Sequence, residues 1–382
     1  MEKWVHKKLG DCCSSELGKT LDEGRNTGKY RPYLCALNVL WGKIDTTIIK
    51  QMRIEDEELN RYLVKKGDLL VCEGGEIGRC AIWNSDDEIY YQNALHRVRF
   101  YDNYDSTFFM YLLCYYNDLN LIEKFGKGLT IKHLNQASFR SIPVSVPDLP
   151  TQRRIAAILS AADKVIEQTR QLISKYKSIK QGMMEDLLKP KEGWKKVKLG
   201  DIGKISMCKR IFSFETSTEG EIPFYKIGTF GKTADAFISR QLYEEYKSKF
   251  SYPKVGDILI SASGTIGRTV VFDGEPAYFQ DSNIIWIDND EQIVLNEYLY
   301  YLYKTISWNL EGSTIARLYN DNFNRIEIFV PDLPEQRRIA KILSGIDRKI
   351  EAEEKVLEKY EKMKKGLMER MLKENYNTNK QI

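Results

Sequence analysis

The sequence VPDLPTQRRIAAILSAAD at residues 146–163 returns as VPDLPEQRRIAKILSGID at residues 330–347. In this register, without a gap, 23 of the 43 positions from 146 to 188 are identical to their counterparts 184 residues later. Chance does not produce such a match, so the chain contains an internal duplication. A segment that stays nearly constant in both copies must do the same work twice.

The regions before these two segments repeat more faintly. EKWVHKKLGD at residues 2–11 matches EGWKKVKLGD at 192–201, and KKGDLLVCEGGEIGR at 65–79 matches KVGDILISASGTIGR at 254–268. Short apolar runs separated by glycine turns predict strands, and we interpret the glycines as β-turns rather than as a phosphate loop. Each copy therefore combines a diverged lobe of mixed α/β structure with a well-kept segment of about 40 residues.

The well-kept segment has the pattern of a long helix. After Pro150 and Pro334, mostly apolar residues recur in alternating steps of three and four, which is the heptad pattern of a coiled coil. The predicted seam in the first copy is Ile155, Ile158, Ala162, Val165, Thr169, Leu172, Tyr176, Ile179 and Met183. In the second copy it is Ile339, Ile342, Ile346, Lys349, Glu353, Val356, Tyr360, Met363 and Leu367, with polar interruptions.

Each helix would be a rod of about 57 Å. Two rods of matched length in one chain most simply pack against one another, although two unrelated helices, each covering its own lobe, would show the same pattern. Additional apolar residues beside the predicted seam widen the stripe and indicate that the helices bind partners. These residues are Leu159, Ile166, Ile173, Leu343, Ile350 and Leu357.

The composition is that of a soluble globular protein. The 58 Lys and Arg residues nearly balance the 54 Asp and Glu residues, so the net charge of +4 indicates no particular partner. Residues 1–11 lack the apolar run of a signal peptide, and no stretch is apolar enough to span a membrane, so we expect a cytoplasmic protein. The seven cysteines include no CxxC pair, so we expect reduced thiols.

The sequence shows no catalytic motif. No GxxxxGK[ST] loop and no GxGxxG after a strand occurs, and the three histidines, His6, His96 and His133, all lie in the first half. Pro331-Asp332 with Glu353-Glu354-Lys355 imitates the acidic triad of metal-dependent nucleases. Those residues would lie on one long helix instead of adjacent strands, so we expect neither catalysis nor a metal site.

The tandem arrangement of lobe, helix, lobe and helix resembles the specificity subunit of type I restriction–modification systems over nearly the whole chain. The most specific elements are the two Pro-Asp-Leu-Pro-x-Gln-Arg-Arg-Ile segments, the strand starts at Gly67 and Gly256, and the openings at Trp4 and Trp194. The resemblance implies an α/β fold with two tandem target recognition domains, separated by two long antiparallel helices in a pseudo-twofold repeat. The expected bounds are 1–149 and 191–333 for the domains, 150–190 and 334–376 for the helices, and 377–382 for a disordered tail.

The resemblance also implies a division of labour. Each lobe would read one half of an asymmetric bipartite site in double-stranded DNA, and the helices would set the spacing and dock two methyltransferase subunits. S-adenosylmethionine, ATP and Mg would be used by the methyltransferase and restriction subunits, and this chain would hold no cofactor. Two hypotheses stay open beside it: a coiled-coil scaffold that binds proteins and is no longer tied to restriction, and a homodimer of the free subunit.

Most candidate DNA-binding residues cluster around the Gly-x-Thr-Ile element that both lobes share. Arg79 and Arg268, at equivalent places after Gly78 and Gly267, are candidate clamps on the DNA backbone, and the Gln and Asn pairs at 92–93 and at 280 and 283 are weaker candidates for base reading. Arg and Asn can read base edges, whereas Lys and Thr more often contact phosphate. In the first lobe they are Arg79, Gln92, Asn93, Lys124, Lys127, Thr130, Lys132, His133 and Arg140. In the second they are Arg268, Gln280, Asn283, Thr314, Arg317, Asn320, Asn322, Asn324 and Arg325. For any one of them, an ordinary solvated side chain is an equally good interpretation.

Paired arginines follow each helix start, at Arg153-Arg154 and Arg337-Arg338. Positive side chains there oppose the helix dipole, which implies a compensating partner. We favour contacts to the lobe or to the methyltransferase over contacts to phosphate.

Overall fold

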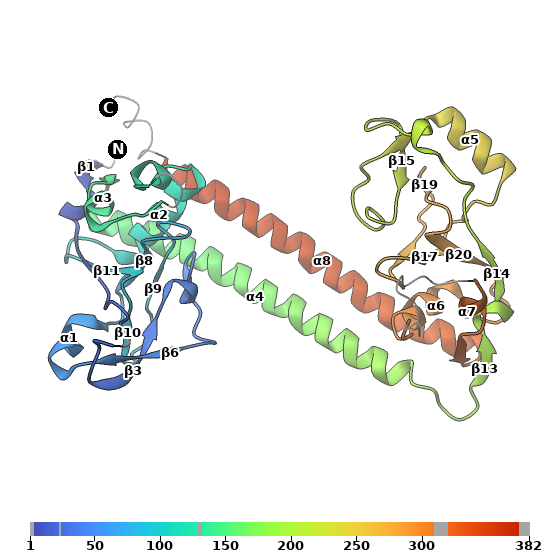
Figure 1. Ribbon diagram of the computed structural model, residues 1–382, viewed down its shortest axis with the longest axis horizontal. Coiled ribbons are helices and arrows are strands. Elements are labelled where there is room, and N and C mark those ends of the chain that lie inside the picture. Colours follow the sequence, from blue (N-terminus) through green and yellow to red (C-terminus); the bar gives the residue numbers. More distant parts are fainter. Residues whose placement is uncertain (1–3, 23, 129–131, 309–319, 374–382) are drawn as a thin grey trace. The chain divides into compact units, whose positions relative to one another are not determined.

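The computed structural model describes residues 4–22, 24–128, 132–308 and 320–373. The contacts divide the chain into two compact units (Figure 1). Unit 1 comprises residues 1–171 and 355–382, and unit 2 comprises residues 172–354. This division passes through the middle of both long helices, so each unit contains a lobe, the start of one helix and the end of the other. The expected tail, 377–382, lies outside the described residues.

Unit 1 is built on two four-stranded sheets. The first has the order β6-β3-β10-β7, with strands Lys50–Ile54, Lys29–Leu34, Ile89–Tyr91 and Leu63–Val64. The second has the order β2-β11-β8-β9, with strands Cys13–Leu17, Leu95–Phe100, Leu69–Cys72 and Cys80–Ile82. Two strand pairs, β1 (Val5–Lys8) with β12 (Pro143–Val146) and β4 (Val39–Leu40) with β5 (Lys43–Ile44), complete the β structure. The helices of the lobe are α1 (Leu59–Tyr62), α2 (Ser106–Asp118) and α3 (Gln136–Arg140).

Unit 2 repeats this plan. Its four-stranded sheet has the order β14-β20-β17-β18, with strands Gly203–Ser206, Ile284–Asn289, Ile258–Ser261 and Thr269–Val271. Its second sheet has the order β16-β15-β19, with strands Phe237–Ile238, Ile222–Tyr225 and Tyr278–Phe279. Strand β13 (Lys195–Lys198) pairs with β21 (Glu327–Val330) as β1 pairs with β12. The helices are α5 (Arg240–Lys249), α6 (Asn296–Tyr303) and α7 (Asn320–Asn324). The mixed α/β repeat that the sequence predicts is therefore confirmed.

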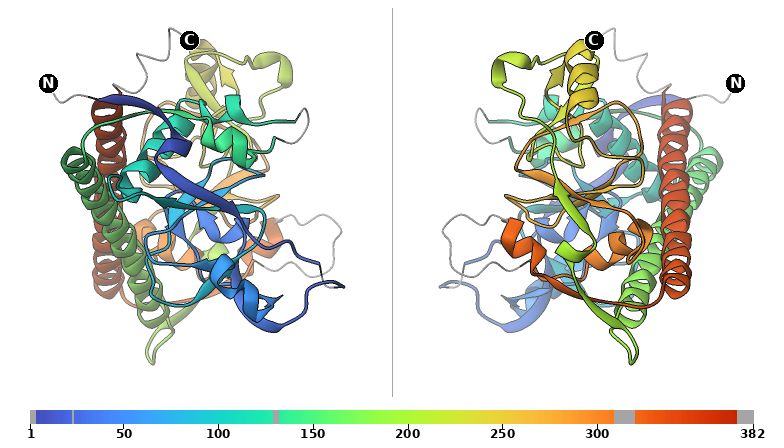
Figure 2. Two further views of the ribbon diagram at one scale, coloured as in Figure 1. Left: turned by 90° about the vertical axis from the view of Figure 1, so that its left-hand side faces the viewer. Right: turned by 90° about the vertical axis from the view of Figure 1, so that its right-hand side faces the viewer.

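The two well-kept segments form α4 (Leu149–Leu187) and α8 (Leu333–Leu372). In unit 1 the start of α4 and the end of α8 lie side by side against the lobe (Figures 1 and 2). Leu159 of α4 and Met368 and Leu372 of α8 share one hydrophobic core with α2. The equivalent residues of unit 2, Leu343 with Met184 and Leu188, enter the core around α6. Each lobe therefore closes its core with helical segments from both sequence copies.

The repeated Pro-Asp-Leu-Pro-x-Gln motif anchors each helix start. Asp148 accepts a hydrogen bond from the Thr151 amide at 2.9 Å, which pairs an otherwise unsatisfied donor of the first turn. The Gln152 side chain, 1% exposed, accepts from the Asp105 amide at 2.9 Å and donates to the Pro147 carbonyl at 2.9 Å. It thereby holds the helix start against the loop that precedes α2.

The second copy makes the same bonds. Asp332 accepts from the Glu335 amide at 3.0 Å, and the fully buried Gln336 accepts from the Leu295 amide at 2.9 Å. Gln336 also donates to the carbonyls of Ile293 and Pro331, both at 2.9 Å. The motif is kept in both copies because it joins a lobe to its helix.

The structure corrects the phase of the predicted heptad seam. Ile158, Val165, Ile179, Met183, Val356 and Met363, all assigned to the seam, are between 36% and 52% exposed. The residues assigned to partner binding are instead packed within the chain: Leu159, Ile166, Ile173, Leu343 and Ile350 are less than 8% exposed, and Leu357 is half-buried. The actual seam steps through Leu159, Ala162, Ile166, Thr169, Ile173 and Tyr176 in α4.

The physical reason is that adjacent apolar residues allow two phases. Three pairs of adjacent apolar residues supply one residue to each phase: Ile158-Leu159, Val165-Ile166 and Leu172-Ile173. The remaining seam positions, such as Ala162, belong to both phases. Packing against the lobe selects one phase, since Leu159 enters the core of unit 1. The exposed row is therefore the surface that remains for a partner.

Ion pairs cross between the two helices within each unit. In unit 1, Arg170 pairs with Glu361 at 2.6 Å, and in unit 2, Lys177 pairs with Glu354 at 2.7 Å. These four residues occupy two positions of the repeat, since Arg170 corresponds to Glu354 and Lys177 to Glu361. The two copies have thus diverged to opposite charge at the positions that face each other.

We predict that Gln152→Leu lowers the free energy of unfolding by roughly 2–4 kcal/mol, because it leaves buried backbone groups unpaired. The change is measured by urea denaturation. Gln168→Leu, at an exposed position of the same helix, is the control and should change stability by roughly 0.5 kcal/mol or less. Equal stability of the two variants would show that the motif glutamine does not anchor the helix.

Candidate functional site

Four loops of unit 1 meet at one edge of the β2-β11-β8-β9 sheet. The Leu134 amide donates to the Glu73 carbonyl at 2.7 Å, and the Glu73 amide donates to the Ala94 carbonyl at 3.0 Å. The Asn93 amide in turn donates to the Lys19 carbonyl at 3.0 Å. These bonds join the β8–β9 turn, the β10–β11 turn, the segment after β2 and the segment of residues 132–134. We call this set of loops the loop edge of unit 1.

Most predicted basic residues of the first lobe project from this edge. Lys124, Lys127, Lys132 and His133 are exposed, and Lys127 and His133 pair through their backbones at 2.8 and 2.9 Å. The His133 ring lies over Gly74, where an added Cβ would stand 3.3 Å from Nδ1. Lys132 pairs with Glu123 at 2.9 Å.

The predicted amide side chains lie beside them. Asn93 is exposed and its Nδ2 donates to Thr20 Oγ1 at 3.5 Å, and Gln92 is half-buried. Thr130 lies outside the described residues.

Three predicted arginines bind carbonyl groups of their own lobe. Arg79 Nη2 donates to the Ala36 carbonyl at 2.7 Å, and its repeat counterpart Arg268 donates from Nη1 to the Phe230 carbonyl at 2.9 Å. Arg140 Nη2 donates to the Gly10 carbonyl at 2.9 Å. All three are half-buried. These bonds give Arg79 and Arg268 a common structural role, which is to tie the turn after β8 or β17 to the neighbouring sheet.

Unit 2 shares one of these backbone bonds, and we call the two turns that it joins the loop edge of unit 2. The Ala262 amide donates to the Asn283 carbonyl at 2.8 Å, as Glu73 does to Ala94 in unit 1. Asn283 Oδ1 also accepts from the Ser263 hydroxyl at 2.7 Å, and Gln280 Oε1 accepts from the Ile227 amide at 2.9 Å. The side-chain oxygens of Asn283 and Gln280 therefore hold neighbouring loops of the edge by hydrogen bonds.

The remaining predicted residues of the second lobe come later in the chain, between residues 314 and 325. Thr314 and Arg317 lie outside the described residues, and the side chain of Asn320 is not among those described. Asn322 and Arg325 are exposed on and after α7. Asn324 is half-buried against Gly200, where an added Cβ would stand 2.9 Å from the Asn324 Cβ.

Sequence reasoning missed an exposed aromatic pair near this edge. Phe212 and Phe214 are 50% and 82% exposed, and their rings stack at 5.6 Å with an interplanar angle of 8°. Arg210, two residues earlier, pairs with Asp281 of the loop edge at 2.9 Å. The sequence signal was the Lys-Arg-Ile-Phe-Ser-Phe stretch at 209–214, in which two basic residues come directly before two closely spaced phenylalanines.

His96 is a structural residue. It is fully buried, its Nε2 donates to the Leu134 carbonyl at 2.7 Å, and its ring stacks on Phe139. Burial lowers the pKa of this imidazole, so the ring stays neutral and holds the backbone at Leu134 in place.

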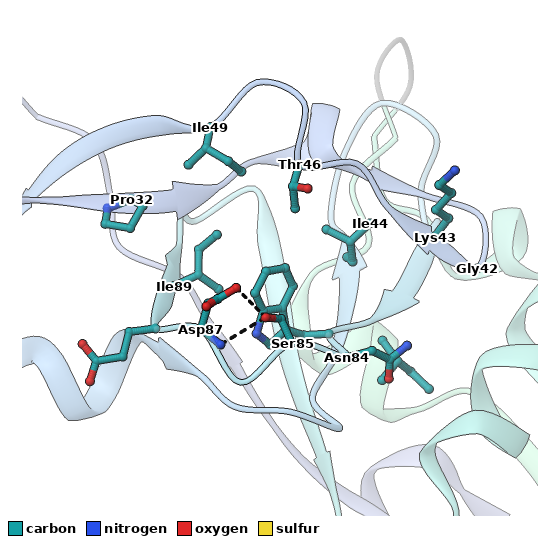
Figure 3. Close-up of a pocket in the computed structure, with 13 residues that line it drawn as sticks. Pro32, Gly42, Lys43, Ile44, Thr46, Ile49, Asn84, Ser85, Asp87 and Ile89 are labelled. Carbon is teal, nitrogen blue, oxygen red and sulfur yellow. Dashed lines mark hydrogen bonds between the residues drawn. The ribbon is translucent and has the colours of Figure 1, made fainter.

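A cavity of about 530 Å³ lies between β3, the β5–β6 loop and the β9–β10 turn (Figure 3). Ser85 donates to Asp87 Oδ2 at 2.6 Å and accepts from the Asp87 amide at 3.1 Å, while Pro32, Ile44 and Ile49 supply apolar walls. No basic residue of the loop edge lines this cavity. Within the described ranges, no group of three or more His, Cys, Asp or Glu side chains is placed to hold a metal ion.

The cysteines of this chain are free thiols. Burial raises the pKa of the Cys13 and Cys208 thiols to about 12, so neither is a reactive thiolate at neutral pH. None of the helices in the described part of the chain is both long and apolar enough to cross a membrane.

Comparison with solved structures supports the fold. The crystal structure of a type I restriction-modification system S subunit from M. genitalium matches with a TM-score of 0.63 at 18% identity, covering 97% of this chain and 96% of that one. A structure described under complex assembly and conformational transition of the type I R-M system matches with a TM-score of 0.59 at 18% identity, covering 97% of each chain.

Sequence comparison identifies the family. A putative type I restriction enzyme specificity subunit of Haemophilus influenzae is 47% identical over 265 residues, which cover 67% of this chain and 68% of the relative. The putative MjaX specificity subunit of Methanocaldococcus jannaschii is 27% identical over 365 residues, covering 86% and 83%. The family model described as type I restriction modification DNA specificity domain matches twice, at residues 1–177 and 191–362. The chain therefore belongs to the family of type I restriction–modification specificity subunits.

Proposed function

We propose that this chain selects the DNA sequence for a type I methyltransferase complex and performs no catalysis itself. The lobe of residues 1–149 would read one half-site, and the lobe of residues 191–333 would read the other. The observation that carries this proposal is the loop edge, where an equivalent backbone bond joins the two turns in both units, Glu73 to Ala94 and Ala262 to Asn283, while the side chains around it differ. A common scaffold with different loops is what two reading heads for two unlike half-sites require.

The chemistry of each edge fits duplex DNA. In unit 1, Lys124, Lys127 and His133 supply positive or hydrogen-bonding groups for phosphate, and Asn93 supplies an amide that can pair with an adenine edge. In unit 2, Asn283 lies at the edge itself, and Asn322 and Arg325, which are exposed on and after α7, offer further base-reading groups. A bipartite site with a non-specific gap follows, because the chain carries two such edges joined through its helices.

The exposed row on the helices supports docking of the methyltransferase subunits. Ile158 and Val165 on α4, with the small residues Ala157 and Ala161 beside them, form an apolar strip in unit 1. Arg153 and Arg337 are exposed at equivalent positions of the two helix starts. Arg338 instead pairs with Glu335 at 2.6 Å. We assign the strip and the two exposed arginines to contacts with the methyltransferase.

Co-expression with the neighbouring methyltransferase, followed by mapping of methylated bases in the host genome, should give a split motif with two different halves. Exchange of the two lobes should exchange the half-sites within that motif. A continuous or palindromic motif would contradict the proposal.

We expect Lys127→Ala to weaken binding of the assembled complex to all DNA sequences alike and to reduce the slope of log affinity against log salt by about one. Lys66→Ala is the matched control, because this exposed lysine lies at the opposite end of β8. Affinity is measured by fluorescence anisotropy over a range of salt concentrations. If affinity and salt slope match those of the control, the lobes act as a protein-binding scaffold instead.

The docking surface is tested by Ile158→Asp combined with Val165→Asp. Burying two carboxylates in an apolar contact should reduce co-purification of the methyltransferase at least tenfold while the chain stays folded. Ser174→Asp, at an exposed position on another face of α4, is the control. Full recovery of the complex with the double variant would place the docking surface elsewhere.

A further inference from the structure

Each unit contains one polar cluster where its lobe meets both helices. The cluster consists of a tyrosine from the lobe, an aspartate from the helix that follows the lobe, and a lysine from the antiparallel helix. We call it the Tyr–Asp–Lys lock. Its members in unit 1 are Tyr111, Asp163 and Lys364, and in unit 2 they are Tyr301, Asp347 and Lys180.

In unit 1, the buried Tyr111 hydroxyl donates to Asp163 Oδ2 at 2.7 Å. Lys364 Nζ pairs with the other carboxylate oxygen, Oδ1, at 2.5 Å. The same ammonium lies 5.4 Å from the centroid of the Tyr111 ring. One lysine therefore contacts both the carboxylate and the ring face of the tyrosine.

Unit 2 repeats this geometry. The Tyr301 hydroxyl donates to Asp347 Oδ2 at 2.7 Å, Lys180 pairs with Asp347 Oδ1, and the ammonium lies 5.5 Å from the Tyr301 centroid. Burial raises the pKa of both tyrosines, so each hydroxyl stays protonated and acts as the donor. Asp and Lys are kept at the same positions of both copies, in contrast to the central ion pairs, whose charges diverged.

The lysines occupy an unusual place in the seam. The core row of α4 continues from Ile173 and Tyr176 to Lys180, and the side chain of Lys180 is only 17% exposed. Lys364 takes the equivalent position of α8 and is 25% exposed. A charged residue at a core position of a heptad costs stability and specifies register, because any other alignment leaves the charge buried without its partner.

The lock also connects the two helices to the lobe. The Tyr–Asp bond fixes the lobe to the helix that follows it in the sequence, and the Asp–Lys pair fixes that helix to the antiparallel one. A slip of one heptad would break both Asp–Lys pairs and shift the helices by about 10.5 Å, which is the length of about three base pairs.

We propose that Lys180 and Lys364 are positioning residues that set the axial register of the helices and thereby the gap between the two DNA half-sites. The inference rests on the proposed function. The lysines touch no DNA in this role, so their loss leaves the choice of bases in each half-site unchanged.

The test replaces both lysines, as Lys180→Leu with Lys364→Leu, in the full chain assembled with its methyltransferase. Methylation is measured on duplexes that carry the wild-type half-sites at the natural gap and at gaps three base pairs shorter or longer. The wild-type chain should prefer the natural gap, and the variant should lose this preference by about tenfold, because leucine suits the seam and no longer selects one register. The charge-preserving pair Lys180→Arg with Lys364→Arg should keep the preference.

The matched control is Lys175→Leu with Lys359→Leu, two exposed lysines that are also equivalent in the repeat. This control removes the same charge from the same helices and should keep the natural gap. A lock variant that reads the same half-sites with an unchanged gap preference overturns the inference.

A second measurement does not depend on DNA. Spin labels at Gln168→Cys and Lys362→Cys, both in unit 1, report the distance between the helices, and single-label samples correct for the native thiols. The wild-type background should give one distance, and the lock variant should add a second population about 3–5 Å longer, because the two labels start side by side and slip past each other along the helix axes. A wild-type chain with no split motif would refute the proposed function, whereas a single unchanged distance in the lock variant would refute the register role.

Discussion

The fold depends on one constraint, which is that neither lobe can close its hydrophobic core with its own sequence copy alone. The core around α2 includes Met368 and Leu372 from the end of α8, and the core around α6 includes Met184 and Leu188 from the end of α4. Burial of these side chains favours a helix that continues without a break from one unit into the next. Each unit therefore depends on segments of both helices, even though it has its own sheets and its own loop edge.

The duplication made the architecture predictable. Identical residues at 23 of 43 positions predicted two equivalent helices, and the fainter repeat predicted two lobes of mixed α/β structure. The role of the motif glutamines was not predictable, because their partners lie in the loops before α2 and α6, more than forty positions away in the chain. The seam phase was wrong by one residue for a related reason, since adjacent apolar residues such as Ile158 and Leu159 fit either phase until the lobe is placed against the helix.

The candidate site shows the same limit of sequence reasoning. The structure brings Lys127 and His133 together beside the turn at Gly74, which the sequence does not relate to them. Arg79, Arg140 and Arg268, also predicted to bind DNA, direct their guanidinium groups to carbonyls of their own lobe. A charged side chain that stabilises a turn and one that faces a ligand have the same sequence signature, and only the partner atoms distinguish them.

The diverged ion pairs have a consequence for how this duplicated gene can evolve. If a second α4 took the place of α8 in the same register, Lys177 would stand where Glu361 is and Arg170 where Glu354 is, so each pair would join two positive charges. Two α8 helices would likewise oppose Glu354 and Glu361. Like charges at these positions disfavour pairing of either helix with a second copy of itself, so the two copies of the repeat fit each other better than they fit themselves. Despite their sequence identity, the two helices have therefore become specialised to their places in the chain.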